Sequence, residues 1–128
     1  MRLLPGQDLK RELDYLVRDR GWSAACVLSG IGSLSSVVIR YAGAERGETL
    51  EGPFEIVSLS GTLSGSGSHL HLLVSDERGE AKAGHLMEGA TIYTTAEIVL
   101  GILPGWAFDR QLDQETGYAE LTIERRRD

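Results

Sequence analysis

The chain has 128 residues, of which 41% are hydrophobic, and its formal net charge is −6 at pH 7. This length gives one core of ordinary size, so we expect a single domain over residues 1–128, and the acidic balance argues against a broad basic surface for nucleic-acid backbones. The lone Cys26 excludes an internal disulfide, and the early charges in MRLLPGQDLKRELD exclude a secretory signal, so a cytoplasmic location is expected.

The first expected element is a helix near the N-terminus. Leucine and valine recur at helical spacing from Leu9 to Val17, Asp8 is a candidate N-cap, and Gly21 is a candidate stop. This segment is the clearest helix of the chain.

The rest of the chain alternates as half-buried strands do, with glycine, serine and aspartate clusters between apolar runs. The polar segment 43–52 predicts a loop, and a turn around Gly30–Gly32 is expected to join the first two strands. The expected strands are 24–29, 34–41, 54–63, 69–75, 81–87, 91–100 and 117–123. A helix followed by six or seven strands predicts an α+β domain, in which one face of a mainly antiparallel sheet packs against flanking helices.

All three histidines of the chain lie between positions 69 and 85. His69 and His71 are two residues apart, so in an extended strand both point to the same face, about 7 Å apart. His85 lies on the next expected strand. With the intervening turn centred near residues 77–78, His85 is one residue out of register with both, and a bulge at Gly84 is expected to correct this.

Three histidines in this arrangement predict a metal site. Three neutral imidazoles with an open fourth position form a well-known catalytic zinc arrangement, and imidazole also suits nickel, cobalt, iron or copper. Zinc is therefore the expected ion, bound by His69, His71 and His85. The alternative is that the three side chains are ordinary polar residues on the solvent face of a sheet.

Glu97 is the only charged residue between Gly89 and Phe108, a run that Glu97 and Pro104 make too polar for a membrane span. A carboxylate inside an expected strand needs a partner. Glu97 is a candidate metal ligand, a candidate acceptor that orients an imidazole, or a candidate catalytic base beside a metal-bound water. The alternative is a rim or subunit-interface residue paired to an arginine.

Four segments carry a resemblance to a known family: VLSGIGSLSSVVIRY, GPFEIVSLSGTLS, GHLMEGATIYTTAEIVLG and DQETGYAEL. Together they resemble the plant and prokaryote conserved domain, over nearly the whole chain. The resemblance implies a compact domain with a mainly antiparallel sheet, assembled as a homotrimer. Stand-alone prokaryotic members often retain histidines at the positions of His69, His71 and His85, whereas plant members generally lack them, which favours the metal site.

In plants this domain follows AT-hooks and binds other nuclear proteins. The 128 residues contain no AT-hook, and Pro53 stands where plant members typically have an arginine. Bacterial members are commonly labelled predicted DNA-binding proteins by analogy, but the acidic charge and the missing hook count against direct DNA contact.

Two functions follow from these observations. The first is a trimeric binding protein, regulatory or DNA-associated, whose metal organises a pocket or interface for a protein partner or a small-molecule ligand. The second is a small zinc-dependent enzyme, a hydrolase or lyase, in which Glu97 moves the proton of a metal-bound water. A cupin-like barrel is a weaker third interpretation, because Glu77 lies six positions after His71 and does not match the usual spacing.

Overall fold

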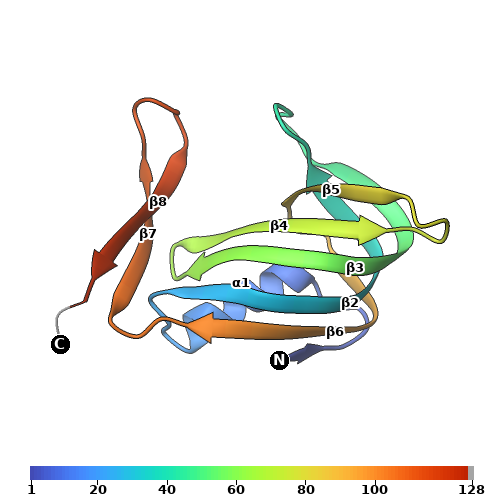
Figure 1. The fold of residues 1–128 in the computed structure, drawn as a ribbon, viewed down its shortest axis with the longest axis horizontal. Coiled ribbons are helices and arrows are strands. Elements are labelled where there is room, and N and C mark those ends of the chain that lie inside the picture. The colour runs from blue at the N-terminus through green and yellow to red at the C-terminus, as the bar shows by residue number, and fades with distance from the viewer. Residues whose placement is uncertain (127–128) are drawn as a thin grey trace.

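The computed structural model describes residues 1–126, which form one helix and eight strands. Six strands form one sheet in the order β1-β6-β2-β3-β4-β5, while β7 and β8 form a separate hairpin, and every pairing is antiparallel (Figure 1). The elements are β1 (Arg2–Leu3), α1 (Leu9–Asp19), β2 (Ala25–Arg40), β3 (Glu48–Ser64), β4 (Gly67–Ser75), β5 (Ala81–Leu86), β6 (Thr91–Ile102), β7 (Trp106–Leu112) and β8 (Ala119–Arg125). The expected α+β class is confirmed, with one helix in the described part where several were expected.

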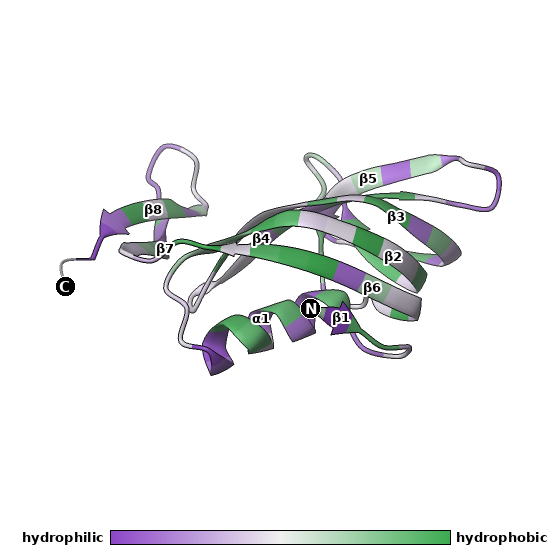
Figure 2. Cartoon of the chain, turned by 60° about the horizontal axis from the view of Figure 1, so that its bottom comes forward, coloured by the Kyte–Doolittle hydropathy of each residue, from purple (hydrophilic) through white to green (hydrophobic). Residues whose placement is uncertain are grey.

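The helix α1 begins and ends where the sequence predicts. The Asp8 side chain accepts a hydrogen bond from the Arg11 N–H at 2.9 Å, which caps the first turn, and Gly21 takes a positive φ of 62° just after the last turn. The apolar stripe of α1 packs against the inner face of the sheet, which buries Leu9 and Leu13 completely (Figure 2). At eleven residues α1 is too short to cross a bilayer, and no other described segment is a helix that could.

The two strands expected before residue 42 are one long strand, β2. Gly32 does not turn the chain. It sits in a bulge with φ of 143°, where a Cβ atom would lie 2.1 Å from the Thr95 carbonyl oxygen, so glycine is required for the close approach of β6. The bulges curl β2, and its last residues pair with β5 as well as with β3.

The β7–β8 hairpin stands at one end of the sheet (Figure 1). The sequence pattern predicts the second strand of this hairpin but leaves the first, β7, as loop. The Phe108 N–H donates to the Ser23 carbonyl at 2.9 Å, and Ser66 donates to the Asp109 carboxylate at 2.6 Å. These hydrogen bonds connect the hairpin to the segment before β2 and to the β3–β4 turn.

Candidate metal centre

Strands β4 and β5 place two of the histidines directly opposite each other, because His71 pairs with His85. The predicted bulge at Gly84 is wrong. The connection is longer than expected, since Ser75 pairs with Ala81, and the Asp76 side chain closes the turn by accepting the N–H groups of Arg78 and Glu80.

Gly84 has a different role. A Cβ atom at this position would lie 2.6 Å from a methyl group of Ile39 and 2.8 Å from the carbonyl oxygen of Arg40. The absence of a side chain therefore lets the end of β2 lie against β5, where Arg40 pairs with His85.

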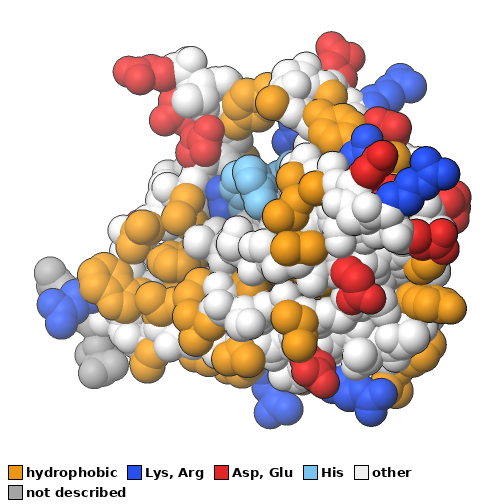
Figure 3. Space-filling model, turned by 45° about the vertical axis from the view of Figure 1, so that its right-hand side comes forward, with side chains coloured by type: hydrophobic (Ala, Val, Ile, Leu, Met, Phe, Trp, Pro, Cys, Tyr) orange, Lys and Arg blue, Asp and Glu red, His pale blue; other side chains and the backbone are white. Residues whose placement is uncertain are grey.

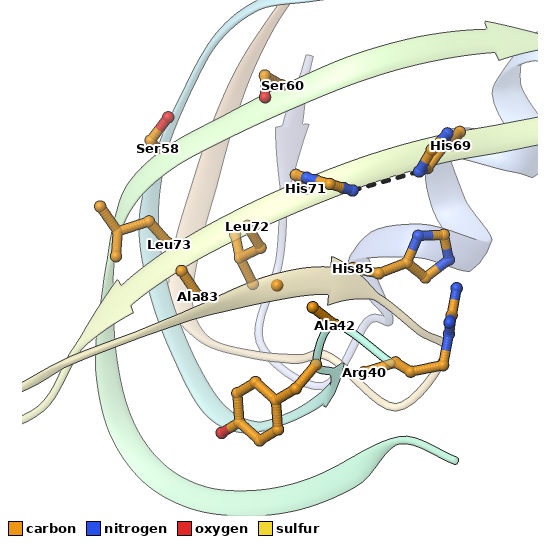
Figure 4. A pocket seen from close by; sticks show the side chains of 12 residues that line it. Arg40, Ala42, Ser58, Ser60, His69, His71, Leu72, Leu73, Ala83 and His85 are labelled. Atoms are coloured by element: carbon orange, nitrogen blue, oxygen red, sulfur yellow. Dashed lines mark hydrogen bonds between the residues drawn. The ribbon is translucent and has the colours of Figure 1, made fainter. Parts of the chain in front are cut away.

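The three imidazoles converge on the outer face of the sheet, away from α1 (Figure 4). Each offers one ring nitrogen, and these atoms lie within 4.8 Å of one another. The Nε2 atoms of His69 and His71 are 3.2 Å apart. Two imidazole nitrogens on one tetrahedral zinc ion lie about 3.4 Å apart, so the pair already has the spacing of two ligands to a shared ion.

The electrostatics of the centre keep two of the imidazoles neutral. Burial, and then the Arg110 and His71 charges, lower the pKa of His69. Burial, and then the charges of His69 and Arg40, lower the pKa of His85 to about 4. A neutral imidazole is the form that binds a metal ion.

One ring nitrogen of His85 lacks a hydrogen-bond partner. Its Nδ1 atom is buried and has no hydrogen-bond partner within residues 1–126. A buried polar atom without a partner is costly, and a metal ion would satisfy it. The donor set therefore fits a divalent ion of the zinc type.

Three hollows meet at the histidines. One, of about 460 Å³, lies toward Arg40 and the end of β2, and a second, of about 530 Å³, lies between His69, His85 and the β7–β8 hairpin. The third, of about 350 Å³, runs along β3 beneath Arg110 and Glu120. Figure 3 shows the histidines in this depression, with basic side chains beside them. All three hollows include His69, so an ion there is open to a ligand from solvent.

Sequence reasoning missed the residues that surround the histidines. Arg40 comes from the end of β2, Arg110 from β7, and Tyr118 and Glu120 from the end of the hairpin. Three of them had one sequence signal, membership of the family-like segments, since Arg40 lies in VLSGIGSLSSVVIRY and both Tyr118 and Glu120 lie in DQETGYAEL. Arg110 lies in none of these segments.

Glu97 is not brought to the histidines. It lies exposed on β6, and strands β2 and β3 separate β6 from β4. Three strand spacings of about 4.8 Å place Glu97 at least about 14 Å from β4, and an offset along the strands adds to this distance. Within one chain it is therefore neither a ligand nor a base beside the ion.

The fold and the centre define a small, mainly antiparallel α+β domain with a three-histidine cluster on the outer face of its sheet. The model of the Plants and Prokaryotes Conserved (PCC) domain matches residues 1–104. The chain belongs to this family, as the four sequence segments indicate. The match ends before the β7–β8 hairpin.

Several known proteins are similar to the chain. The bifunctional protein GlmU of Synechococcus sp. (strain JA-2-3B'a(2-13)) is 50% identical over 97% of the chain and 20% of that relative, so the chain spans about a fifth of the length of the curated relatives it matches. A hypothetical protein from Salmonella enterica has a solved structure with 46% identity and a TM-score of 0.96, covering 98% of this chain and 91% of that one.

Two more distant structures carry functional names. A metal-containing protein from Archaeoglobus fulgidus is 32% identical with a TM-score of 0.76, covering 95% of this chain and 90% of that one. A protein from Ralstonia eutropha, provisionally named DNA-binding, is 24% identical with a TM-score of 0.80, covering 97% of this chain and 88% of that one. The second likeness shows the fold alone.

Proposed function

We propose that the chain is a metal-dependent binding module in which His69, His71 and His85 hold one zinc ion whose open coordination position faces the surrounding hollows. The observation that carries this proposal is the convergence of three imidazoles within 4.8 Å on the outer face of two paired strands. The zinc ion would supply a positive charge and a Lewis-acid position for a ligand. The histidines orient that position toward solvent.

Two relatives support this function. The Archaeoglobus fulgidus protein, which shares the fold at 32% identity, is described as metal-containing. In the Synechococcus protein the matching segment is one fifth of a longer bifunctional protein, which suits a module that works beside other domains. The proposal places the module in the cytoplasm, where a lone cysteine stays reduced.

We further propose that the module assembles as a homotrimer. Strands β2, β3 and β6 expose four aliphatic side chains on the outer face, each more than half exposed: Leu28, Ile31, Val57 and Val99. Exposed aliphatic side chains on neighbouring strands are typical of a subunit interface. Glu97 pairs in register with Ile31 beside this surface, which suits the interpretation of Glu97 as an interface residue.

A zinc-dependent hydrolase or lyase is the second candidate, and one observation favours it. Glu120, and not Glu97, is the carboxylate that lines a hollow together with His69 and His71. Glu120 accepts a hydrogen bond from the Thr116 hydroxyl at 3.0 Å. We rank binding first because Glu120 is only half-buried on the hairpin, and the hydrogen bond from Thr116 is the one contact that the structure shows to hold its carboxylate within residues 1–126. The net charge of −6 opposes direct contact with DNA phosphates, so we do not extend the proposal to DNA.

Metal analysis combined with native mass spectrometry, on protein purified without a histidine tag, tests the proposed function. We expect a trimer with one zinc ion per chain, and we expect His71→Ala to lose the zinc. Ser58→Ala is the matched control, because Ser58 lines the same hollow without offering an imidazole, and it should retain the ion. Zinc content that His71→Ala leaves unchanged would contradict the metal site, and a monomer mass would contradict the assembly.

A further inference from the structure

Two arginine side chains face the three-histidine centre from different elements. Arg40, at the end of β2, lines the hollow of about 530 Å³ together with His69 and His85, and its guanidinium lies beside His85 (Figure 4). Arg110, on β7, lines the same hollow from the hairpin side. Both guanidinium groups therefore line the hollow that also contains His69 and His85.

Neither guanidinium is neutralised by an ion pair within residues 1–126. Arg40 donates to the Ala44 carbonyl at 3.4 Å, and Arg110 donates to the Thr62 hydroxyl at 3.0 Å. Both acceptors are uncharged. Lys10, the other cation near His85, differs because it pairs with the Asp14 carboxylate at 2.7 Å.

The centre is therefore a positive spot on an acidic chain. A divalent ion and two guanidinium groups would face the single carboxylate of Glu120 among the described lining residues. Positive charges that line one hollow repel one another. A bound anion removes that repulsion.

The shape and the donors of the hollow favour a small oxyanion. Its volume of about 530 Å³ suits a small molecule, and the polar residues Ser66, Ser68 and Tyr118 also line it. A guanidinium group binds carboxylate or phosphate through two parallel hydrogen bonds, and zinc accepts an oxygen of either group.

We propose that the centre recognises a small molecule with two carboxylate or phosphate groups, one bound to the metal ion and the other to Arg40 and Arg110. This inference rests on the proposed function, since it needs the ion. Arg110, Tyr118 and Glu120 belong to the β7–β8 hairpin, outside residues 1–104 that match the family model. The hairpin therefore makes part of the anion site from a segment that the family match does not include.

Cobalt(II)-loaded protein gives a direct test, because a ligand that enters the coordination shell changes the visible spectrum of the cobalt ion. Malonate and pyrophosphate are the two probes, and isothermal titration calorimetry measures their affinity. We expect saturable binding of at least one probe. Tighter binding of malonate would assign the site to carboxylate ligands, and tighter binding of pyrophosphate would assign it to phosphate ligands.

The arginine variants test the second half of the site. Arg40→Met and Arg110→Met should each weaken binding of the preferred probe by about tenfold to a hundredfold, as expected for the loss of a charged hydrogen-bond donor. Arg110→Lys should bind with intermediate affinity, because lysine keeps the positive charge but cannot donate the two parallel hydrogen bonds of a guanidinium group. Arg78→Met, in the β4–β5 turn, is the matched control and should bind as the wild type does.

The outcomes separate this inference from the proposed function. Failure of wild-type protein to retain cobalt would overturn both. Retained cobalt with no spectral change at about 10 mM of either probe would overturn the anion site alone. So would methionine variants that both bind the preferred probe as tightly as the wild type does. Removal of cobalt by the probes at the same rate in wild type and variants would show simple chelation and would also overturn the anion site.

Circular dichroism checks the folding of each variant. Where Arg110→Met does not fold, Arg110→Lys provides the test instead.

Discussion

The two faces of strand β4 have different roles. On the inner face Leu70, Leu72 and Val74 are buried in the core beneath the sheet, while on the outer face His69 and His71 are exposed. The inner residues are required by the fold, because removing them would expose or empty the core. The outer residues satisfy no packing requirement, so their identity reflects what the surface binds. One strand therefore separates stability from function by simple alternation.

The largest effect is expected on the inner face. Leu70→Ala should lower the free energy of unfolding by about 2–5 kcal/mol, because it leaves a cavity under the sheet. Leu73→Ala, at a half-buried position on the same strand, should cost much less. Urea unfolding of the metal-free proteins measures both. Equal losses would show that the two faces of β4 contribute equally to stability.

A backbone change links the two faces. Gly61 has φ of 143°, and a Cβ atom there would lie 2.0 Å from the His69 carbonyl oxygen. Gly61→Ala should cost about 1–3 kcal/mol of unfolding free energy and should also weaken zinc binding, because β4 must shift under His69. Gly65→Ala is the control, since a Cβ atom at that position meets nothing within 4 Å. Unchanged zinc affinity in Gly61→Ala would show that the position of His69 does not depend on this contact.

The smallest effect is expected from pH in the metal-free protein. The pKa of His85 is about 4 in the folded state against an ordinary value of 6.5, so between these values the unfolded chain binds a proton that the folded chain does not. The free energy of unfolding should therefore fall as the pH falls from 6.5 toward 4, and this contribution should be constant above 6.5. Solvent screening at this open site keeps the effect small.

The measurement combines two observables. An NMR titration should show that His85 is protonated at a pH well below that of histidines in unfolded peptides. The unfolding free energy of His85→Gln should fall less between pH 6.5 and 4 than that of the wild type. A titration of His85 near pH 6.5 would mean that burial and the neighbouring charges do not reach it.

Local patterns predicted much of the fold and part of the centre. The helix from Leu9 and its cap at Asp8 follow from spacing within a few residues, and so does the shared direction of His69 and His71. The β4–β5 register was missed by one residue, because the turn length decides it and the Asp76 turn is longer than the pattern indicates.

Other features depend on contacts distant in sequence. Gly32 resembles a turn residue and yet lies within β2, because its need for a small residue comes from β6. Arg40 reaches His85 only because β2 curls back to β5, and Arg110 reaches His69 only because the hairpin lies against the sheet. The pattern of a single sequence carries no information on such contacts between distant segments.

The close approach at Gly84 also concerns self-association. Strand β5 forms the edge of the six-stranded sheet, and an uncovered edge invites pairing with another chain. The end of β2 covers the half of β5 that contains His85 and Leu86, and the charged Lys82 lies on the other half. The end of β2 thus occupies the backbone edge beside His85, where a strand of another chain would otherwise pair.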